Sequence, residues 1–391
     1  MGVREAEIKE AIVTIKIFGV GGGGNNVLRR LAESNQFDSQ LIAINTDARQ
    51  LKSVAECGVD TLMIGEHLTR GLGTGGKVEI GQKAAIDGEE QIRQEMYGAD
   101  MVFITAAMGG GVGTGAAPVV ARIARDLGVL SIGIVTEPFS FEGNRKLKTA
   151  RAGIEEMKQY MDALLVVKND NLLKMNNKKL NMKDAFTMAD ETLRQAISCI
   201  VEIIQTTGII NVDFADAVTI FRQGFSSEAV LGTGEADTAV DAVKAAINNP
   251  LVDKDINGAK GIIVNITSST GIPIYDVGDA TQFLYENAHD NVNIIWGIVE
   301  EPEMDGRVRA TVVATDFVDS IQPFKNGVFR NNYLGGNVPP INNRNFNAEA
   351  IAPNAGQPVN QQTAENADDI APPAPKKGLD MDLPGFMTRK F

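Results

Sequence analysis

Two glycine-rich loops, each between a predicted strand and a predicted helix, constrain the fold of this 391-residue chain more than any other feature. The first reads GVGGGGNN (19–26) and the second reads MGGGVGTG (108–115). Glycine lets the backbone approach a phosphate closely, and a helix N-terminus offers free N–H groups at the positive end of its dipole. Two such loops predict that one nucleoside di- or triphosphate is held from two sides. Neither loop is followed by Lys-Ser or Lys-Thr, which excludes a Walker-type P-loop.

The first loop alone leaves a second ligand class open. It contains a GxGxxG pattern at Gly19, Gly21 and Gly24, and Asp47 follows at the end of the next predicted strand, as in NAD-dependent oxidoreductases. Such an oxidoreductase needs only one glycine loop, and this chain offers no candidate acid for hydride transfer. The second loop therefore favours the nucleotide polyphosphate.

Short β-branched runs alternate with amphipathic stretches over the first 180 residues. The predicted strands are 12–20, 41–45, 101–106, 130–136 and 163–167, and the predicted helices lie near 27–36, 79–97, 114–127 and 145–161. This alternation predicts an α/β fold with a doubly wound parallel sheet.

A long helix is predicted from Asp184, which can cap its start, to residue 207, with Gly208 as a left-handed residue after its end. A smaller α+β unit follows, with helices near 236–248 and 278–289 and strands at 261–267, 293–299 and 307–316. Beyond residue 320 lie nine of the fourteen prolines, with many Asn and Gln residues, a composition typical of disorder.

We therefore predict five segments. They are a nucleotide-binding domain (1–183), a central helix with an acidic loop (184–223), a C-terminal α+β domain (224–320), a disordered linker (321–379) and a docking peptide (380–391).

Charge and composition exclude several classes of function. Lys and Arg total 37 against 50 Asp and Glu, a net charge of −13, which argues against nucleic-acid binding and against direct binding to an anionic membrane. Two cysteines and two histidines, far apart, support no zinc site, disulfide framework or Ser-His-Asp triad. A charged N-terminus and the lack of an 18-residue apolar stretch predict a cytoplasmic protein.

Taken together, the motifs resemble the FtsZ family of tubulin-like bacterial cell-division GTPases. The resemblance covers roughly residues 10–320, and the terminal LPGF (383–386) is similar to the family's C-terminal peptide. The matching motifs are GVGGGGNN (19–26), NTDA (45–48), RGLGTGG (70–76), MGGGVGTGAAP (108–118), PFSFEG (138–143), ND (169–170) and NVDFADA (211–217). The resemblance implies a tubulin-like fold and a GTPase that polymerises head to tail into the division ring at mid-cell.

The resemblance also implies the residues that bind GTP or GDP. Glu142 would contact the ribose, Phe186 would stack on the base, and Asn169 and Asp190 would read the guanine edge. The expected nucleotide-binding residues are Gly21, Gly22, Gly23, Gly24, Asn25, Asn26, Asp47, Gly110, Gly111, Val112, Gly113, Thr114, Glu142, Lys146, Asn169, Phe186 and Asp190. Magnesium would be bound mainly by phosphates and water, so no protein metal site is expected.

Three sites depart from the family pattern. Lys77-Val78 replaces the usual Asn-Pro after the third glycine-rich stretch, which would place a cation near the terminal phosphate. Val112 stands where a threonine is usual, which removes one hydroxyl near the γ-phosphate, and Lys146 stands where an arginine is usual. The changes at Val112 and Lys146 prompt an alternative, a filament-forming or scaffolding paralogue that binds nucleotide but hydrolyses it weakly.

The acidic loop that contains Asn211, Asp213 and Asp216 has two interpretations. Asp213 can cap the following helix, with Asp216 in its first turn. It can also be catalytic: Asp213 follows Asp190 by 23 residues, roughly 35 Å along a helix, too far to reach the same molecule's γ-phosphate. The resemblance favours catalysis in trans on a neighbouring subunit. Asp213 and Asp216 would act on the attacking water, and Asn211 would have a positioning role.

The terminal peptide predicts how the filament reaches the membrane. The segment has apolar side chains at Leu383, Pro384 and Phe386, close in sequence to the cations Arg389 and Lys390. Such a pattern is typical of a segment that folds on binding a protein adaptor.

Deletion of residues 380–391 is expected to leave GTP turnover and polymer formation near wild type and to abolish recruitment to vesicles that carry the adaptor. Phe386→Ala should reproduce most of that loss, because the ring would occupy an apolar groove. Vesicle co-sedimentation measures both; equal recruitment of the truncated chain would locate the anchor elsewhere.

Overall fold

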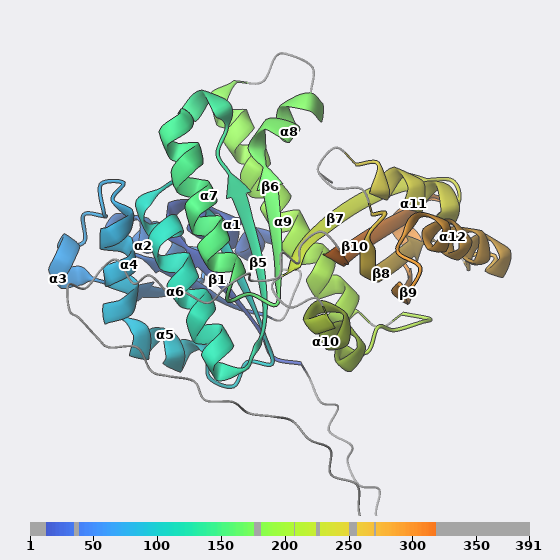
Figure 1. Ribbon diagram of the computed structural model, residues 1–391, viewed down its shortest axis with the longest axis horizontal. Helices are drawn as coiled ribbons and strands as arrows, with labels where there is room; N and C mark the ends of the chain where they lie inside the picture. The colour runs from blue at the N-terminus through green and yellow to red at the C-terminus, as the bar shows by residue number, and fades with distance from the viewer. Residues whose placement is uncertain are drawn as a thin grey trace, which may run out of the picture. The chain divides into compact units, whose positions relative to one another are not determined.

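A ten-stranded sheet organises the protein in the computed structural model, which describes residues 13–34, 39–175, 181–206, 208–223, 227–249, 256–269 and 271–317 (Figure 1). Its strand order is β3-β2-β1-β4-β5-β6-β7-β10-β8-β9. The strands are β1 (Ile15–Val20), β2 (Gln40–Asn45), β3 (Asp60–Met63), β4 (Met101–Ala107), β5 (Leu130–Glu137), β6 (Ala163–Lys168), β7 (Ser227–Ala236), β8 (Ala259–Ser268), β9 (Asn293–Glu300) and β10 (Val308–Phe317).

The helices lie between these strands and pack on both faces of the parallel part of the sheet. The α-helices are α1 (Gly21–Ser34), α2 (Ala48–Ala55), α3 (Glu66–Thr69), α4 (Val78–Asp87), α5 (Glu89–Met96), α6 (Gly111–Leu127), α7 (Asn144–Lys158), α8 (Asn169–Met175), α9 (Met182–Gln205), α10 (Phe214–Gln223), α11 (Ala239–Ile247) and α12 (Ile274–Asn287). Two short 3₁₀ turns, η1 (Ser140–Glu142) and η2 (Pro302–Met304), complete the described elements.

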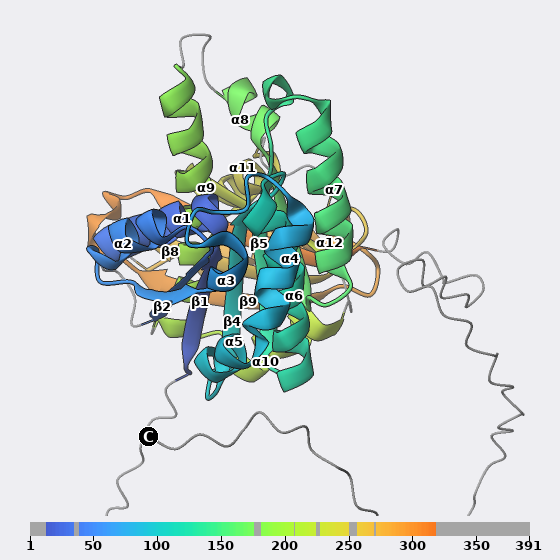
Figure 2. The ribbon, with the colours of Figure 1, turned by 90° about the vertical axis from the view of Figure 1, so that its left-hand side faces the viewer.

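Strands β1 to β6 pair in parallel, as the strand–helix alternation predicts. One apolar core joins the sheet to α1, α2, α9 and α10, and a second joins its other face to α4, α5, α6 and α7 (Figure 2). Because both faces are covered, strands such as β4 read as unbroken apolar runs. The doubly wound prediction is confirmed.

The second part of the sheet is antiparallel at its centre. β10 pairs with β7 on one side and with β8 on the other, while β9 adds in parallel at the edge. Helices α11 and α12 pack on this part through a third apolar core that includes Val243 and Leu284. The predicted α+β character is confirmed, while the five segment boundaries stay predictions and the linker and docking peptide lie outside the described residues.

The long helix is present with different ends. Asn181, not Asp184, is the N-cap of α9, because the Asn181 side chain accepts a hydrogen bond from the Asp184 amide at 2.9 Å. Asp184 lies in the first turn, where a carboxylate suits the dipole. The C-cap of α9 is Thr206, so Gly208 lies two residues beyond it and not at the C′ position, and a Cβ on Gly208 would lie 2.1 Å from the Ile298 carbonyl oxygen.

Several elements carry no clear sequence signal. β3 is a short edge strand whose residues are exposed or half-buried, and β7 contains two glycines and two glutamates. The predicted helix near 79–97 is two helices, because Gly88 separates α4 from α5 and packs against Ile64. No helix within the described ranges is long and apolar enough to span a membrane.

Helices α4 and α6 pack unusually closely through two glycines. A Cβ on Gly115 would lie 2.2 Å from the Val78 carbonyl oxygen, and one on Gly81 would lie 2.3 Å from the Gly111 carbonyl oxygen. These contacts are with backbone atoms, so no side chain can rotate away to make room.

Gly115→Ala is expected to lower the free energy of unfolding by about 1–3 kcal/mol, because overpacking forces the two helices apart. Gly278→Ala is the matched control: this helical glycine of α12 has no atom within 4 Å of its Cβ position. The control should be neutral or stabilising by about 0.5–1 kcal/mol, since alanine favours helix. Urea unfolding measures both, and equal stability of the two variants would contradict the packing argument.

Candidate nucleotide-binding site

A cavity of about 380 Å³ lies at the carboxyl ends of the parallel strands. This is the edge at which open α/β sheets bind ligands. Twelve of the predicted nucleotide-binding residues form part of its wall: Gly22, Gly23, Asp47, Gly110, Gly111, Val112, Gly113, Glu142, Lys146, Asn169, Phe186 and Asp190. Their contacts with a nucleotide stay predictions, but the fold brings them to one place.

The two glycine loops touch each other at the base of the cavity. Gly21 has φ +73°, and a Cβ on it would lie 2.8 Å from the Gly113 amide nitrogen. A Cβ on Gly23 would lie 2.3 Å from the Ala107 Cβ, and one on Gly113 would lie 2.6 Å from the Ala107 carbonyl oxygen. Only glycine permits this approach, which directs the N-termini of α1 and α6 at the same space.

A third glycine-rich stretch, 70–76, completes the wall and was not among the predicted contacts. Leu72, Gly73, Thr74 and Gly75 all line the cavity. The motif RGLGTGG carries the signal that could have identified them, since its glycines at 71, 73, 75 and 76 all have positive φ.

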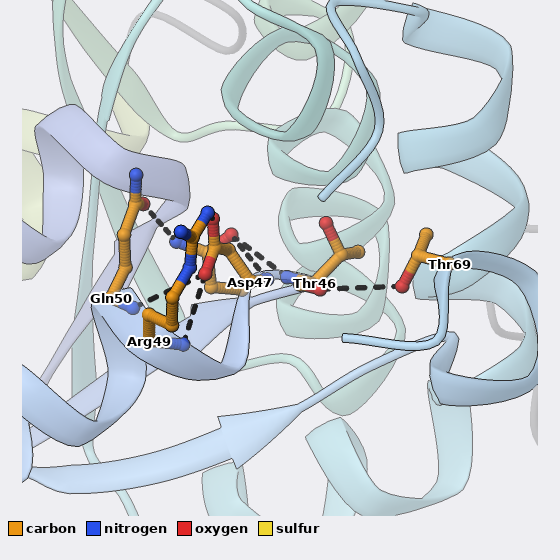
Figure 3. Close-up of polar contacts among 6 residues, drawn as sticks. Thr46, Asp47, Arg49, Gln50 and Thr69 are labelled. Carbon is orange, nitrogen blue, oxygen red and sulfur yellow. Dashed lines mark hydrogen bonds and ion pairs between the residues drawn. The ribbon is translucent and has the colours of Figure 1, made fainter. Parts of the chain in front are cut away.

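Hydrogen bonds fix this third stretch and the preceding Thr69 to the end of β2, and Figure 3 shows the bond from Thr69 to Thr46. The Thr46 carbonyl oxygen accepts from the Thr69 hydroxyl at 3.3 Å and from the Gly73 amide at 3.2 Å. Asp47 caps α2 by accepting from the Arg49 amide at 2.9 Å. Asp47 is therefore a structural cap whose carboxylate also reaches the cavity wall.

Polar groups at one end of the cavity are buried without full partners. Asn169 is 4% exposed, and its Oδ1 has no hydrogen-bond partner among the described residues. Such an atom is costly unless a ligand satisfies it. The nearby Phe186 ring is held edge-on by Phe139 and Phe141, at centroid distances of 5.6 and 6.2 Å.

Asp190 lies beside these groups on α9. Burial raises its pKa to about 6, although the charges of Arg30 and Arg29 and a hydrogen bond from Asn26 act in the opposite direction. The Arg30 Nε lies 4.0 Å from Asp190 Oδ2, beyond hydrogen-bond distance. Asp190 is thus a desolvated carboxylate suited to a ligand that brings N–H donors.

Glu142 and Lys146 form an ion pair on the wall of the cavity. The Lys146 Nζ lies 2.9 Å from Glu142 Oε2, while Glu142 Oε1 accepts from the Phe139 amide at 3.0 Å. The pair holds Glu142, the predicted ribose contact, in a fixed orientation.

Five predicted residues lie behind the wall: Gly21, Gly24, Asn25, Asn26 and Thr114. The Thr114 hydroxyl accepts from the Gly109 amide at 2.8 Å, and a Cβ on Gly24 would lie 2.4 Å from the Thr105 carbonyl oxygen. With its amide nitrogen toward the first loop, Asn25 donates to the Gly19 and Gly21 carbonyls at 2.8 and 2.9 Å. These residues shape the loops, and direct nucleotide contact by them stays a prediction.

The acidic loop is not part of the cavity wall. Asp213 precedes α10 and accepts from the Ala215 amide at 3.4 Å, Asp216 lies in the first turn, and Asn211 accepts from the Gly208 amide. From Asp190 to its last residue, Gln205, α9 covers about 22 Å. The roughly 35 Å expected from the sequence assumed a helix that continued to Asp213, whereas α9 ends at Gln205, before the loop.

Comparisons with known proteins agree with this architecture. Residues 14–177 match the Tubulin/FtsZ family GTPase domain, and residues 227–318 match the FtsZ family C-terminal domain. An FtsZ from M. jannaschii, solved as an empty dimer, is 37% identical over 78% of this chain and 89% of its own, with a TM-score of 0.72.

More distant proteins share the fold. CetZ2 from Haloferax volcanii, solved as a GTPγS-bound protofilament, is 21% identical over 79% of this chain and 96% of its own, with a TM-score of 0.67. CetZ from Methanosaeta thermophila is 19% identical over 79% of this chain and 88% of its own, also with a TM-score of 0.67. With both domains matched and one FtsZ similar over most of its length, the chain belongs to the Tubulin/FtsZ family of GTPases.

Proposed function

We propose that this protein binds and hydrolyses GTP and polymerises head to tail into the filaments of the cell-division ring. The observation that carries the proposal is the separation of two groups of residues. One cavity gathers the glycine loops and the desolvated Asp190, while Asp213 and Asp216 lie beyond the other end of α9.

The cavity suits a guanine nucleotide at both ends. The N1–H and 2-amino groups of guanine would donate to the Asp190 carboxylate, and adenine lacks this pair of donors. The free amide groups at the N-termini of α1 and α6, which have no intrahelical partner, would bind the phosphates. Within the described residues, no three His, Cys, Asp or Glu side chains form a metal site. Magnesium would therefore depend mainly on phosphate and water oxygens.

The position of the acidic loop supports hydrolysis in trans. A loop beyond the far end of α9 would act on the nucleotide of a neighbouring subunit. Such a head-to-tail contact is heterologous and generates an open filament. The FtsZ dimer and the CetZ2 protofilament support self-association of this chain.

Exposed apolar side chains lie near both surfaces of the proposed contact, beside the cavity and beside the acidic loop. Leu72, beside the cavity, is 72% exposed, and Phe141 is 53% exposed. Ile209, next to the acidic loop, is 61% exposed. Burial of two such patches against each other would stabilise the filament.

The wider role rests on the same proposal. The filament would assemble in the cytoplasm at mid-cell, and division adaptors would bind the docking peptide that includes Leu383, Pro384 and Phe386.

Val112 favours one alternative, a filament or scaffold paralogue with weak GTPase activity. This apolar residue lines the cavity within the second glycine loop, where it donates no side-chain hydrogen bond to a phosphate. Phosphate release measured together with GTP-dependent sedimentation separates the two: the alternative gives polymer with little phosphate.

Asp190→Asn should stabilise the nucleotide-free protein and weaken guanine binding. The pKa of Asp190 is raised from 3.8 to about 6, so the ionised carboxylate destabilises the folded state above that pH. Removing the charge at pH 7.5 is expected to gain about 2–3 kcal/mol at most. The gain should vanish as the pH falls toward 4, because the wild-type carboxyl is then protonated.

Thermal unfolding against pH measures this effect, with Glu191→Gln on the adjacent, more exposed position as control. The wild-type affinity for GDP should also fall, by up to about tenfold per pH unit below 6, because one oxygen of the protonated acid becomes a donor and no longer accepts from guanine. A destabilised Asp190→Asn protein at pH 7.5 would contradict the assigned desolvation.

Asp216→Ala and Asp213→Ala are expected to retain GTP binding and lose most GTP turnover, because the carboxylates act on a neighbour's nucleotide. Mixing Asp216→Ala with Asp190→Asn should restore part of the activity. In the mixed filament one subunit supplies an intact cavity and the next supplies an intact acidic loop. Phosphate release measures the recovery.

Asp290→Ala, which removes an exposed acid between α12 and β9, is the control for a change of charge. Full turnover by dilute, strictly monomeric wild-type protein would rule out catalysis in trans.

A further inference from the structure

Lys77 occupies the N-cap of α4, a position that does not suit a lysine. Its backbone is extended, with φ −86° and ψ 114°, and its side chain makes no capping hydrogen bond. N-caps are usually Ser, Thr, Asp or Asn, whose oxygens accept from the free amides of the first turn. A cation there is also opposed by the positive end of the helix dipole. Helix stability therefore does not account for this residue.

The backbone of Lys77 packs against the second glycine loop. Its amide donates to the Thr74 carbonyl oxygen at 3.3 Å. A Cβ built on Gly111 would lie 3.1 Å from the Lys77 amide nitrogen and 2.0 Å from the Thr74 hydroxyl oxygen. Thr74 and Gly111 both line the cavity. Lys77 thus begins directly behind the wall, and its flexible four-carbon stem, roughly 6 Å long, is sufficient to reach over the rim.

The arrangement of the layers puts Lys77 at the phosphate end. Asp190 and Phe186 belong to α9, which packs with α1 on one face of the sheet, whereas α4 packs with α6 on the other. A nucleotide with its base beside α9 and its phosphates over the N-termini of α1 and α6 therefore ends near α4.

Lys77 is exposed, and no ion pair is found for its Nζ among the described residues. Two other cations near the cavity are already paired, Lys146 with Glu142 at 2.9 Å and Arg49 with Asp47 at 3.7 Å. A terminal phosphate would give Lys77 the anion that its own surroundings lack.

We propose that Lys77 contacts the terminal phosphate of the bound nucleoside triphosphate and so makes the site prefer a triphosphate to a diphosphate. This inference rests on the proposed function, because it requires a nucleotide in the cavity. It assigns to one side chain a selectivity for the terminal phosphate beyond the phosphate binding by the glycine-loop amides.

The test compares the affinities of the full-length protein for GDP and for a non-hydrolysable GTP analogue, at concentrations where it is monomeric. Lys77→Ala should weaken binding of the triphosphate by about tenfold, as expected for a charge-assisted hydrogen bond partly screened by solvent. Binding of GDP should change less than about twofold, within the scatter of surface substitutions. Lys77→Arg should retain most of the preference, and Lys83→Ala, an exposed lysine of the same helix, should change neither affinity.

Lys77→Asn separates binding from folding. Asparagine is a favoured N-cap, so this variant should unfold at a higher temperature than wild type in the absence of nucleotide, yet lose the triphosphate preference. A loss of selectivity in a stabilised protein cannot come from a damaged loop.

Three results would overturn the inference. Equal losses for GDP and the triphosphate would mean that Lys77 supports the loop. Unchanged affinities with impaired sedimentation would assign Lys77 to the contact between subunits, and unchanged affinities with normal sedimentation would leave it without a role. If the wild-type protein binds neither nucleotide, the proposed function itself fails, which the variants are not needed to reveal.

Discussion

The contact between the two glycine loops is the constraint on which the rest of the site depends. Gly21 meets the Gly113 amide, and Gly23 meets Ala107, at distances that no Cβ would allow. Because these backbones touch, α1 and α6 begin at the same point above β1 and β4, and their free amides face one space. The loop glycines that are predicted to contact the nucleotide are therefore also needed for packing between the two loops. Gly24, which is not part of the cavity wall, packs against the Thr105 carbonyl oxygen.

Asp190 illustrates how such a site opposes stability. A carboxylate that was fully paired with Arg30 would have a lowered pKa and would help to hold the fold. Here burial dominates, and the pKa rises to about 6. The folded protein carries a charge that the hydrogen bond from Asn26 and the charges of Arg29 and Arg30 compensate only in part. The unpartnered Asn169 Oδ1 has the same character. Buried polar groups are normally paired within the protein, and these two incompletely paired groups are ones that a ligand would satisfy.

Much of this architecture could be predicted from the sequence, because its signals are periodic or depend on glycine. The runs that became β4 and β5 are apolar throughout, and both glycine loops lie between a strand and a helix, as predicted. The misses have physical reasons. β3 is an exposed edge strand with no apolar alternation, and the cap of α9 moved to Asn181 because propensity does not decide between two nearby capping residues. Thr74 entered the wall through the hydrogen bonds between the third stretch and β2, which connect segments distant in sequence.

Because α9 separates the cavity from the acidic loop, a filament would contain fewer complete reaction centres than subunits. In the proposed filament, each complete reaction centre needs one subunit's cavity and the next subunit's loop. A filament of n subunits then contains n − 1 centres, and its two ends differ: one displays an open cavity and the other an unused acidic loop. A nucleotide at the open end would not be hydrolysed, because it lacks a neighbour's acidic loop. Under this proposal, turnover per subunit would rise with length, steeply for short oligomers and hardly at all for long ones, so the protein's activity would report the mean filament length.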